Sequence, residues 1–301
     1  MINTKFANSA LSKNILTKYS GQDAVPLTDA AFDEWRKYIY DRCGIYFQDN
    51  KKYLLESRLQ KRMKFLNLSN YDEYFKFVRF STPGSEEVKY LYEAITINET
   101  FFFRNQPQID ALVNKIIPEM IASRPQTGRY KFRIWSAASS SGEEAYTIAM
   151  AVTDLLKPKY PGLEVEIVGT DINYAVIETA SKGIYKEYSV RNTPAYYLKK
   201  YFKTNGNTFE INPELKKMVS FKLLNLYDDM SMRMMRSFDV IFCANVLIYF
   251  DLNSKIRVVN HLYNSLNKDG YLFIGYSETL HGISKAFKVV SFPKTIGYKK
   301  E

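Results

Sequence analysis

The sequence predicts an α/β fold, in which helices cover both faces of a mostly parallel sheet, preceded by an all-helical N-terminal domain. After Pro107, short apolar runs alternate with segments of helical periodicity, a pattern typical of doubly wound α/β domains. Between residues 27 and 95, apolar residues recur only at helical spacing. A chain of 301 residues is long enough to give each part its own core.

The N-terminal part begins with residues 1–26, which are polar and weakly patterned and predict a flexible leader. Four helices are expected over residues 27–95. Thr28 is a suitable N-cap for the first helix, and Gly44 is a suitable end for it. We expect residues 96–107 to form a linker that contributes to a ligand site.

Residues 108–301 are expected to form the α/β domain, beginning with a helix over 109–121. The expected strands are 130–135, 165–171, 218–224, 238–244 and 271–275, with a closing pair near Val289 and Ile296. Further helices are expected over 143–156, 174–182 and 255–266. Tyrosine-rich and polar sequence over 184–217 interrupts this alternation and predicts a small inserted subdomain.

The composition restricts the class of protein. No apolar run approaches the roughly 18 residues that a membrane span needs, and the first residues lack a signal-peptide pattern. We therefore expect a cytoplasmic protein without membrane insertion. Cys43 and Cys243 lie far apart in apolar contexts and are expected to be reduced core residues. The two histidines have no metal-ligand spacing, so no metal site is expected.

The net charge is +10 and is not spread evenly, because one segment, residues 51–64, is strongly basic. Its basic residues are Lys51, Lys52, Arg58, Lys61, Arg62 and Lys64. A solvated helix face is the simplest interpretation, whereas nucleic-acid binding and docking on an acidic protein are alternatives. Composition alone does not choose among them.

The clearest functional signal is the segment Trp135-Ser-Ala-Ala-Ser-Ser-Ser-Gly-Glu-Glu144, which joins an expected strand to an expected helix. A small-residue loop followed by a helix N-terminus lets backbone N–H groups approach a ligand closely. The next expected strand ends in Asp171, and a carboxylate there suits a ribose diol because it can accept from both hydroxyls. These features predict an adenosine-containing cofactor.

The loop then distinguishes among adenosine cofactors. It contains a single glycine, Gly142, and no Gly-Lys-Ser/Thr motif, so it lacks the cradle that a pyrophosphate requires. It offers instead Glu143 and Glu144, with Asp171 beyond the next strand. Such carboxylates favour a cationic cofactor, S-adenosylmethionine. The alternative for Glu143 and Glu144 is that they only complement the helix dipole.

Five segments together resemble blocks of the CheR-type chemotaxis receptor methyltransferases. They are Asn98-Glu-Thr-Phe-Phe-Phe-Arg104, Trp135–Glu144, Gly169-Thr-Asp-Ile172, Phe238–Asp251 and Gly270-Tyr-Leu-Phe-Ile-Gly-Tyr-Ser-Glu278. Their order and spacing fit the family from about residue 27 to residue 300. The resemblance implies a Rossmann-like S-adenosylmethionine-dependent methyltransferase domain with a small antiparallel β insertion, preceded by an all-α domain.

The resemblance also implies roles for single residues. Asn98, Thr100 and Arg104 match the linker segment that closes over the cofactor, with Arg104 also catalytic. Glu144 matches the acid for the amino-acid portion, and Asp171 matches the ribose-binding acid. Asn225 and Leu226 match a pair that lines the adenine region. Asn245 matches a residue beside the cofactor, and Tyr249 matches a catalytic tyrosine near the transferred methyl group.

One position departs from the family pattern, which often has arginine immediately before the asparagine of the Cys-x-Asn-Val block. Here that residue is Ala244, so either Arg104 or another basic residue serves the substrate carboxylate in its place, or turnover is slower. The alternative for Tyr249 is an interior aromatic residue whose hydroxyl is hydrogen-bonded. Phe101, Phe102 and Phe103 are expected in the core.

The resemblance implies methyl transfer to glutamate side chains in the cytoplasmic helical domain of methyl-accepting chemotaxis receptors, with S-adenosylhomocysteine as the second product. A glutamate carboxylate is already ionised at neutral pH, so this reaction needs no general base, and these motifs contain no histidine and only the expected core residue Cys243. The alternatives are a nucleic-acid methyltransferase and a non-catalytic S-adenosylmethionine-binding module. The sequence Ala244-Asn-Val-Leu lacks the Asn/Asp-Pro-Pro-aromatic motif common in nucleic-acid amino methyltransferases, so no nucleic-acid partner is expected.

Two further expectations concern the receptor. Arg58, Lys61 and Arg62 are expected to dock on the acidic receptor helices. The Asn205-Gly206 pair in the insertion suits a tight hairpin turn, which leaves little strand edge for an added peptide. We therefore expect an enzyme that does not depend on a C-terminal receptor peptide. Separately, we expect the protein to be monomeric.

Overall fold

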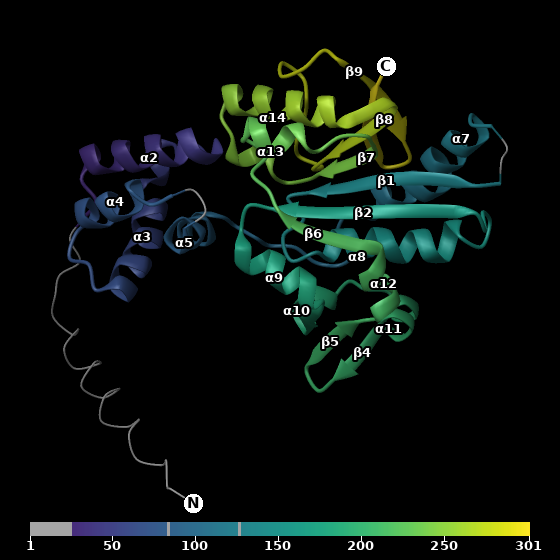
Figure 1. Cartoon of the computed structure of the whole chain (residues 1–301), viewed down its shortest axis with the longest axis horizontal. Helices are drawn as coiled ribbons and strands as arrows, with labels where there is room; N and C mark the ends of the chain where they lie inside the picture. Colours follow the sequence, from purple (N-terminus) through teal and green to yellow (C-terminus); the bar gives the residue numbers. More distant parts are fainter. Residues whose placement is uncertain (1–25, 83–84, 126–127) are drawn as a thin grey trace, which may run out of the picture.

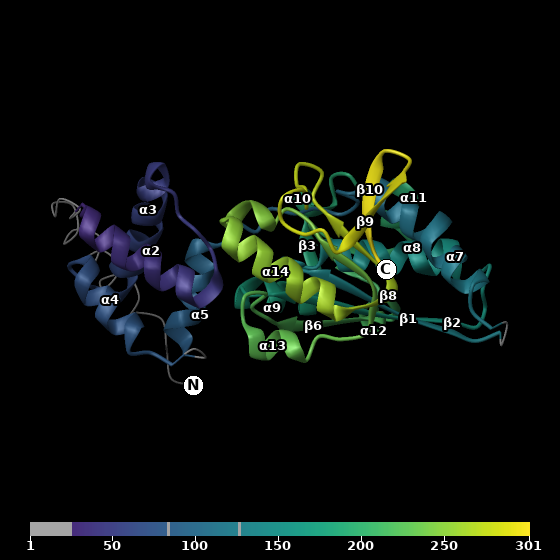
Figure 2. The same ribbon diagram turned by 90° about the horizontal axis from the view of Figure 1, so that it is seen from above.

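The computed structural model describes residues 26–82, 85–125 and 128–301. The expected leader therefore lies outside the described residues except for Pro26. A helical domain lies at one end of an α/β domain, and the chain passes between them once, through the linker (Figures 1 and 2). No helix in these described ranges combines the length and apolar character needed to cross a membrane.

The helical domain consists of a short bundle, and its helices agree with the four expected from the sequence. The four helices are α2 (Asp29–Cys43), α3 (Lys52–Leu66), α4 (Tyr71–Arg79) and α5 (Glu86–Ile95), and a 3-10 turn, η1 (Asp49–Lys51), directly precedes α3. The Thr28 hydroxyl caps α2 by accepting from the Ala31 N–H, and Gly44 ends it in the left-handed conformation. The bundle encloses its own apolar core around Trp35, Leu55 and Leu59.

The α/β domain contains a seven-stranded sheet in the order β6-β2-β1-β7-β8-β10-β9. Its strands are β1 (Tyr130–Ala137), β2 (Leu163–Asp171), β6 (Val219–Leu223), β7 (Phe238–Cys243), β8 (Leu266–Ile274), β9 (Phe287–Phe292) and β10 (Thr295–Lys300). The first five in this order pair in parallel, and the expected closing pair is antiparallel. The strand order reverses at β1, and the carboxyl ends of β1 and β2 point towards the helical domain (Figure 1).

Helices cover both faces of this sheet, as the sequence predicts. One face carries the helix α6 (Gln106–Ala111), η2 (Leu112–Ile116) and α7 (Ile117–Ala122), together with α8 (Glu143–Ala151) and its extension η3 (Val152–Leu156). The other face carries α13 (Asp229–Arg233) and α14 (Leu252–Ser265). The helix α9 (Tyr174–Lys182) contacts β2 and β6, and the 3-10 turn η4 (Leu247–Tyr249) follows β7.

The insertion projects from the domain below α9 in Figure 1. It contains β3 (Ile184–Lys186), α10 (Glu187–Val190), α11 (Ala195–Tyr201), β4 (Phe202–Asn205), β5 (Thr208–Ile211) and α12 (Pro213–Met218). Its three strands form an antiparallel sheet in the order β3-β5-β4. Asn205 pairs with Thr208, so the two turn residues are Gly206 and Asn207, one position later than the predicted Asn-Gly turn. Only Gly206 has a positive φ, which fits a hairpin with glycine first in the turn.

Candidate functional site

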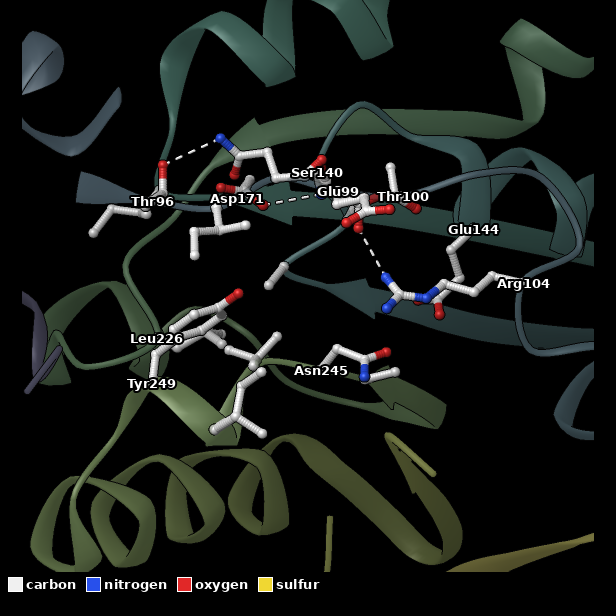
Figure 3. A pocket seen from close by; sticks show the side chains of 18 of the residues that line it. Thr96, Glu99, Thr100, Arg104, Ser140, Glu144, Asp171, Leu226, Asn245 and Tyr249 are labelled. Carbon is white, nitrogen blue, oxygen red and sulfur yellow. Dashed lines mark hydrogen bonds between the residues drawn. The ribbon is translucent and has the colours of Figure 1, made fainter. Parts of the chain in front are cut away.

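A pocket lies where the carboxyl ends of the parallel strands face the helical domain (Figure 3). Ligands of open α/β sheets bind at this edge, next to the point where the strand order reverses. All nine residues predicted for the cofactor and catalysis line the pocket: Asn98, Thr100, Arg104, Glu144, Asp171, Asn225, Leu226, Asn245 and Tyr249. The three predicted docking residues do not line it.

The loop after β1 forms one wall of the pocket. Its backbone bends sharply, with positive φ angles at Ala138, Ser140 and Gly142. A Cβ at Gly142 would lie 2.8 Å from the Phe221 ring and 2.9 Å from the Ala180 Cβ. The single glycine is therefore required by packing against β6 and α9, and this packing brings the N-terminus of α8 close to the pocket.

Asp171 joins this loop to the end of β2. One carboxylate oxygen accepts from the Ser140 N–H at 2.9 Å (Figure 3). The other accepts from the Asn173 N–H at 3.0 Å. Burial raises the pKa of Asp171 above its ordinary value, and the backbone N–H groups oppose that rise. The carboxylate therefore lies in the pocket wall with lone pairs that can accept from a diol.

The two adjacent glutamates of the motif have different surroundings. Glu144 lines the pocket, accepts from the Ser136 hydroxyl at 2.8 Å, and has Arg104 nearby. Burial raises its pKa. Glu143 is buried away from the pocket, accepts from the Ser141 hydroxyl at 2.7 Å, and faces the insertion. The expectation that both carboxylates belong to the site is therefore wrong for Glu143.

The linker crosses the pocket as a strap, here defined as residues 98–104. The Ser140 hydroxyl donates to the Asn98 carbonyl at 2.9 Å, and the Phe103 N–H donates to the Thr147 hydroxyl at 3.2 Å. Phe102 and Phe103 are buried, as expected, whereas Phe101 is only partly buried.

Arg104 ends the strap and turns its guanidinium back towards it (Figure 3). Its Nη1 donates to the Glu99 carbonyl at 2.8 Å. The Arg104 side chain is exposed to solvent at the pocket, so its other N–H groups are accessible to a ligand. A guanidinium in this position can orient a carboxylate with two parallel hydrogen bonds.

The helical domain supplies part of the pocket that the sequence did not reveal. Cys43, Ile45 and Ile95 line it beside Asn225 and Leu226. The Asn225 amide donates to the Arg42 carbonyl at 2.7 Å, which ties this edge to the end of α2. Cys43 is buried, as expected, but no local sequence signal distinguishes a core cysteine from one that also borders a ligand pocket.

The loop after β7 carries Asn245 and Tyr249. Glu278 holds this loop by accepting from the N–H groups of Gly275, Asn245 and Ile248, at 2.6, 2.9 and 3.2 Å. This role was not predicted, although Glu278 ends one of the five family-like segments. These hydrogen bonds join the loop after β7 to the end of β8. Asn245 has a positive φ of 63°, which asparagine tolerates better than most residues.

Tyr249 lies opposite the strap (Figure 3). Its hydroxyl makes no hydrogen bond within the described part of the chain. Burial raises the pKa of this phenol, and the nearby Arg58 and Arg104 oppose the rise. Tyr249 therefore remains protonated at neutral pH and can donate a hydrogen bond to a ligand.

The predicted docking residues lie on α3, but only Lys61 is exposed. Arg62 forms an ion pair with Glu87 at 2.7 Å, in which both side chains are largely buried, and Glu87 also accepts from Tyr74. Arg58 is partly buried and donates to the Ile95 carbonyl. The expected basic face is therefore corrected, because the guanidinium groups of Arg58 and Arg62 bind Ile95 and Glu87 within the protein.

The chain is similar to known proteins over nearly its whole length. Residues 98–296 match the family model "CheR methyltransferase, SAM binding domain", and residues 30–96 match "CheR methyltransferase, all-alpha domain". The chain is 35% identical over 277 residues to chemotaxis protein methyltransferase 2 of Vibrio cholerae, which covers 92% of this chain and 94% of that protein. It is 40% identical over 247 residues to the chemotaxis protein methyltransferase of Borreliella burgdorferi, with coverages of 82% and 87%.

Proposed function

This chain belongs to the CheR methyltransferase family, and we propose that it methylates glutamate side chains in the cytoplasmic helical domain of methyl-accepting chemotaxis receptors. Its activity is S-adenosylmethionine-dependent methyl transfer, as the sequence predicted. The observation that carries the substrate proposal is the meeting of Arg104 and Tyr249 in one pocket with Glu144 and Asp171. A receptor substrate of this kind places the enzyme in the cytoplasm.

The residues of the pocket fit the cofactor by their chemistry. Asp171 suits the ribose hydroxyls, and Glu144 suits the cationic amino group. Asn98, Thr100, Asn225, Leu226 and Asn245 complete the walls. When bound, S-adenosylmethionine supplies a methyl group on a sulfonium.

The proposed transfer needs orientation more than acid–base chemistry. The substrate carboxylate forms an O–CH3 bond while the S–CH3 bond breaks, which leaves S-adenosylhomocysteine and a methyl ester. The nucleophile is already ionised, so the protein contributes placement and the exclusion of water. We assign the orientation of the carboxylate to Arg104, in the absence of an arginine at Ala244, and a donated hydrogen bond beside it to Tyr249.

The direct test is incorporation of labelled methyl into receptor. We expect label that is released by mild alkali, because methyl esters hydrolyse there whereas methylamines do not. Label that resists alkali, or that enters DNA or RNA instead, would support the nucleic-acid alternative. Cofactor binding without any incorporation would support a non-catalytic module.

A second prediction concerns receptor docking through the exposed lysines of α3. Replacing Lys61 and Lys64 by glutamate is expected to raise the KM for receptor several-fold, because substrate glutamates lie on acidic helices. Cofactor affinity, measured by calorimetry, should not change. Lys159→Glu is the matched control, since Lys159 is exposed just before β2, at the opposite end of this strand from the pocket. An equal effect of the control would argue against α3 as the docking surface.

Arg62 is unsuitable for that test. Arg62→Glu would bring a second carboxylate against Glu87 in a largely buried position, where breaking an ion pair costs about 3–5 kcal/mol. A loss of activity in that variant would report unfolding of the helical domain rather than loss of docking.

A third prediction concerns the insertion. Its hairpin has a two-residue turn, and its outer strand β4 has four residues, which leaves a short edge for an added peptide strand. We propose that the enzyme is peptide-independent, so removal of the receptor's C-terminal tail should change the initial rate by less than about twofold. A large rate loss on the truncated receptor would show that the tail is bound.

A further inference from the structure

The insertion contacts the strap through α10 and the residues that follow it. The Tyr188 hydroxyl donates to Glu99 Oε1 at 2.5 Å, and the Phe102 N–H donates to the Ser189 carbonyl at 3.0 Å. The guanidinium of Arg191 lies 3.6 Å from the centre of the Tyr188 ring and 3.9 Å from the centre of the Phe101 ring. Residues 188–191 thus touch the strap at three residues, Glu99, Phe101 and Phe102.

Glu99 is held at both of its oxygen-bearing groups. Its carboxylate accepts from Tyr188, and its carbonyl accepts from Arg104 Nη1 at 2.8 Å. Arg104 also lies near the Phe101 ring, with its guanidinium carbon 5.8 Å from the ring centre. A continuous series of contacts therefore runs from Tyr188 through Glu99 to the guanidinium at the pocket.

We propose that Tyr188 is a positioning residue, which holds Glu99 and thereby orients the Arg104 guanidinium towards the substrate carboxylate. This inference rests on the proposed role of Arg104 in methyl transfer. An exposed arginine has many rotamers, and orientation is what this reaction requires. The insertion then serves the active site directly, in addition to any contact with receptor.

The position of Tyr188 separates this role from simple packing. Its side chain is 56% exposed, so loss of the hydroxyl removes no core contact. The Phe102–Ser189 backbone hydrogen bond remains in place in a Tyr188→Phe variant. The substitution should therefore leave the fold intact and act on Glu99 alone.

The test measures kcat, receptor KM and S-adenosylhomocysteine affinity for Tyr188→Phe, with Tyr196→Phe as the matched control. Tyr196 is an exposed tyrosine of the same insertion whose hydroxyl contacts Lys200 rather than the strap. We expect kcat to fall about three- to tenfold in Tyr188→Phe, with KM and cofactor affinity within about twofold of the unsubstituted protein. The control should match the unsubstituted protein in all three.

Three further variants test whether Tyr188 affects kcat through Glu99 and Arg104. Glu99→Gln keeps an acceptor for Tyr188 and should retain activity, whereas Glu99→Ala should lose as much as Tyr188→Phe. In an Arg104→Ala background, Tyr188→Phe should have no further effect on kcat, because it acts through Arg104. An additional loss in that background, or an unchanged kcat in Tyr188→Phe alone, would overturn the proposal.

Hydrogen exchange gives a readout that needs no substrate. In the cofactor-free protein, a peptide covering the strap should exchange faster in Tyr188→Phe than in Tyr196→Phe. An unchanged exchange rate in Tyr188→Phe would contradict the proposal that Tyr188 holds Glu99. If the unsubstituted enzyme forms no alkali-labile methyl ester, the proposed function fails, while the exchange result still decides whether Tyr188 holds the strap.

Discussion

Replacing Arg104 by alanine is expected to lower kcat on the order of 10- to 100-fold at saturating cofactor. Charge-assisted hydrogen bonds contribute about 1.5–3 kcal/mol, and each 1.36 kcal/mol of transition-state stabilisation is about tenfold in rate. Arg104 has one N–H committed to the Glu99 carbonyl, which leaves the rest of the guanidinium for the substrate. Receptor KM should change less than kcat, because the proposed docking surface is the exposed lysines of α3 rather than the pocket.

Arg104→Lys separates charge from geometry. Lysine keeps the positive charge but loses the planar fork that binds a carboxylate through two bonds, so it should recover only part of the lost rate. Full recovery would mean that charge alone suffices. An unchanged rate in both variants would show that Arg104 has no role in the mechanism. No residue would then be identified that replaces the family arginine found at the position of Ala244. Tyr249→Phe should lower the rate less, because it removes one neutral donor.

Most of the fold could be predicted from local sequence patterns. The alternation after Pro107 predicted the α/β domain, and the helical spacing before residue 95 predicted the helical domain. Both could be predicted because the apolar periodicity of a helix or strand is visible within its own segment of sequence. The family resemblance then predicted nine residues that line the pocket. Six of them end or follow strands whose carboxyl ends meet at one edge of the sheet, and the other three, Asn98, Thr100 and Arg104, lie on the strap.

The misses arose where the outcome depends on contacts distant in sequence. Glu143 and Glu144 are adjacent, and successive residues on a helix point about 100° apart, so only one can face the pocket. Arg62 appeared to be a free cation until Glu87, 25 residues away, was placed beside it. The pocket wall at Cys43 depends on how α2 packs against Asn225, which no local pattern encodes.

The second large effect is expected at Asp171. Asp171→Ala should weaken S-adenosylmethionine binding about 10- to 100-fold, measured by calorimetric titration, because it removes one or two hydrogen bonds to the ribose. The same change frees the N–H groups of Ser140 and Asn173, so part of the loss will come from the loop after β1. Thermal unfolding should show a folded protein, and unchanged affinity would sink the ribose assignment.

The pH dependence of binding tests the same carboxylates without altering the loop. Burial raises the pKa of both Asp171 and Glu144, and the cofactor's hydroxyls and amino group favour their ionised forms. Protons therefore compete with the cofactor, and affinity should weaken as the pH falls through the raised pKa values. Because these exceed the ordinary carboxyl values of about 4, the loss should begin closer to neutrality than for exposed carboxylates. Glu144→Gln removes one titrating group, so its affinity should be lower at neutral pH and fall less steeply on acidification. If cofactor affinity falls with decreasing pH as steeply in Glu144→Gln as in the unsubstituted protein, Glu144 does not bind the cationic amino group of the cofactor.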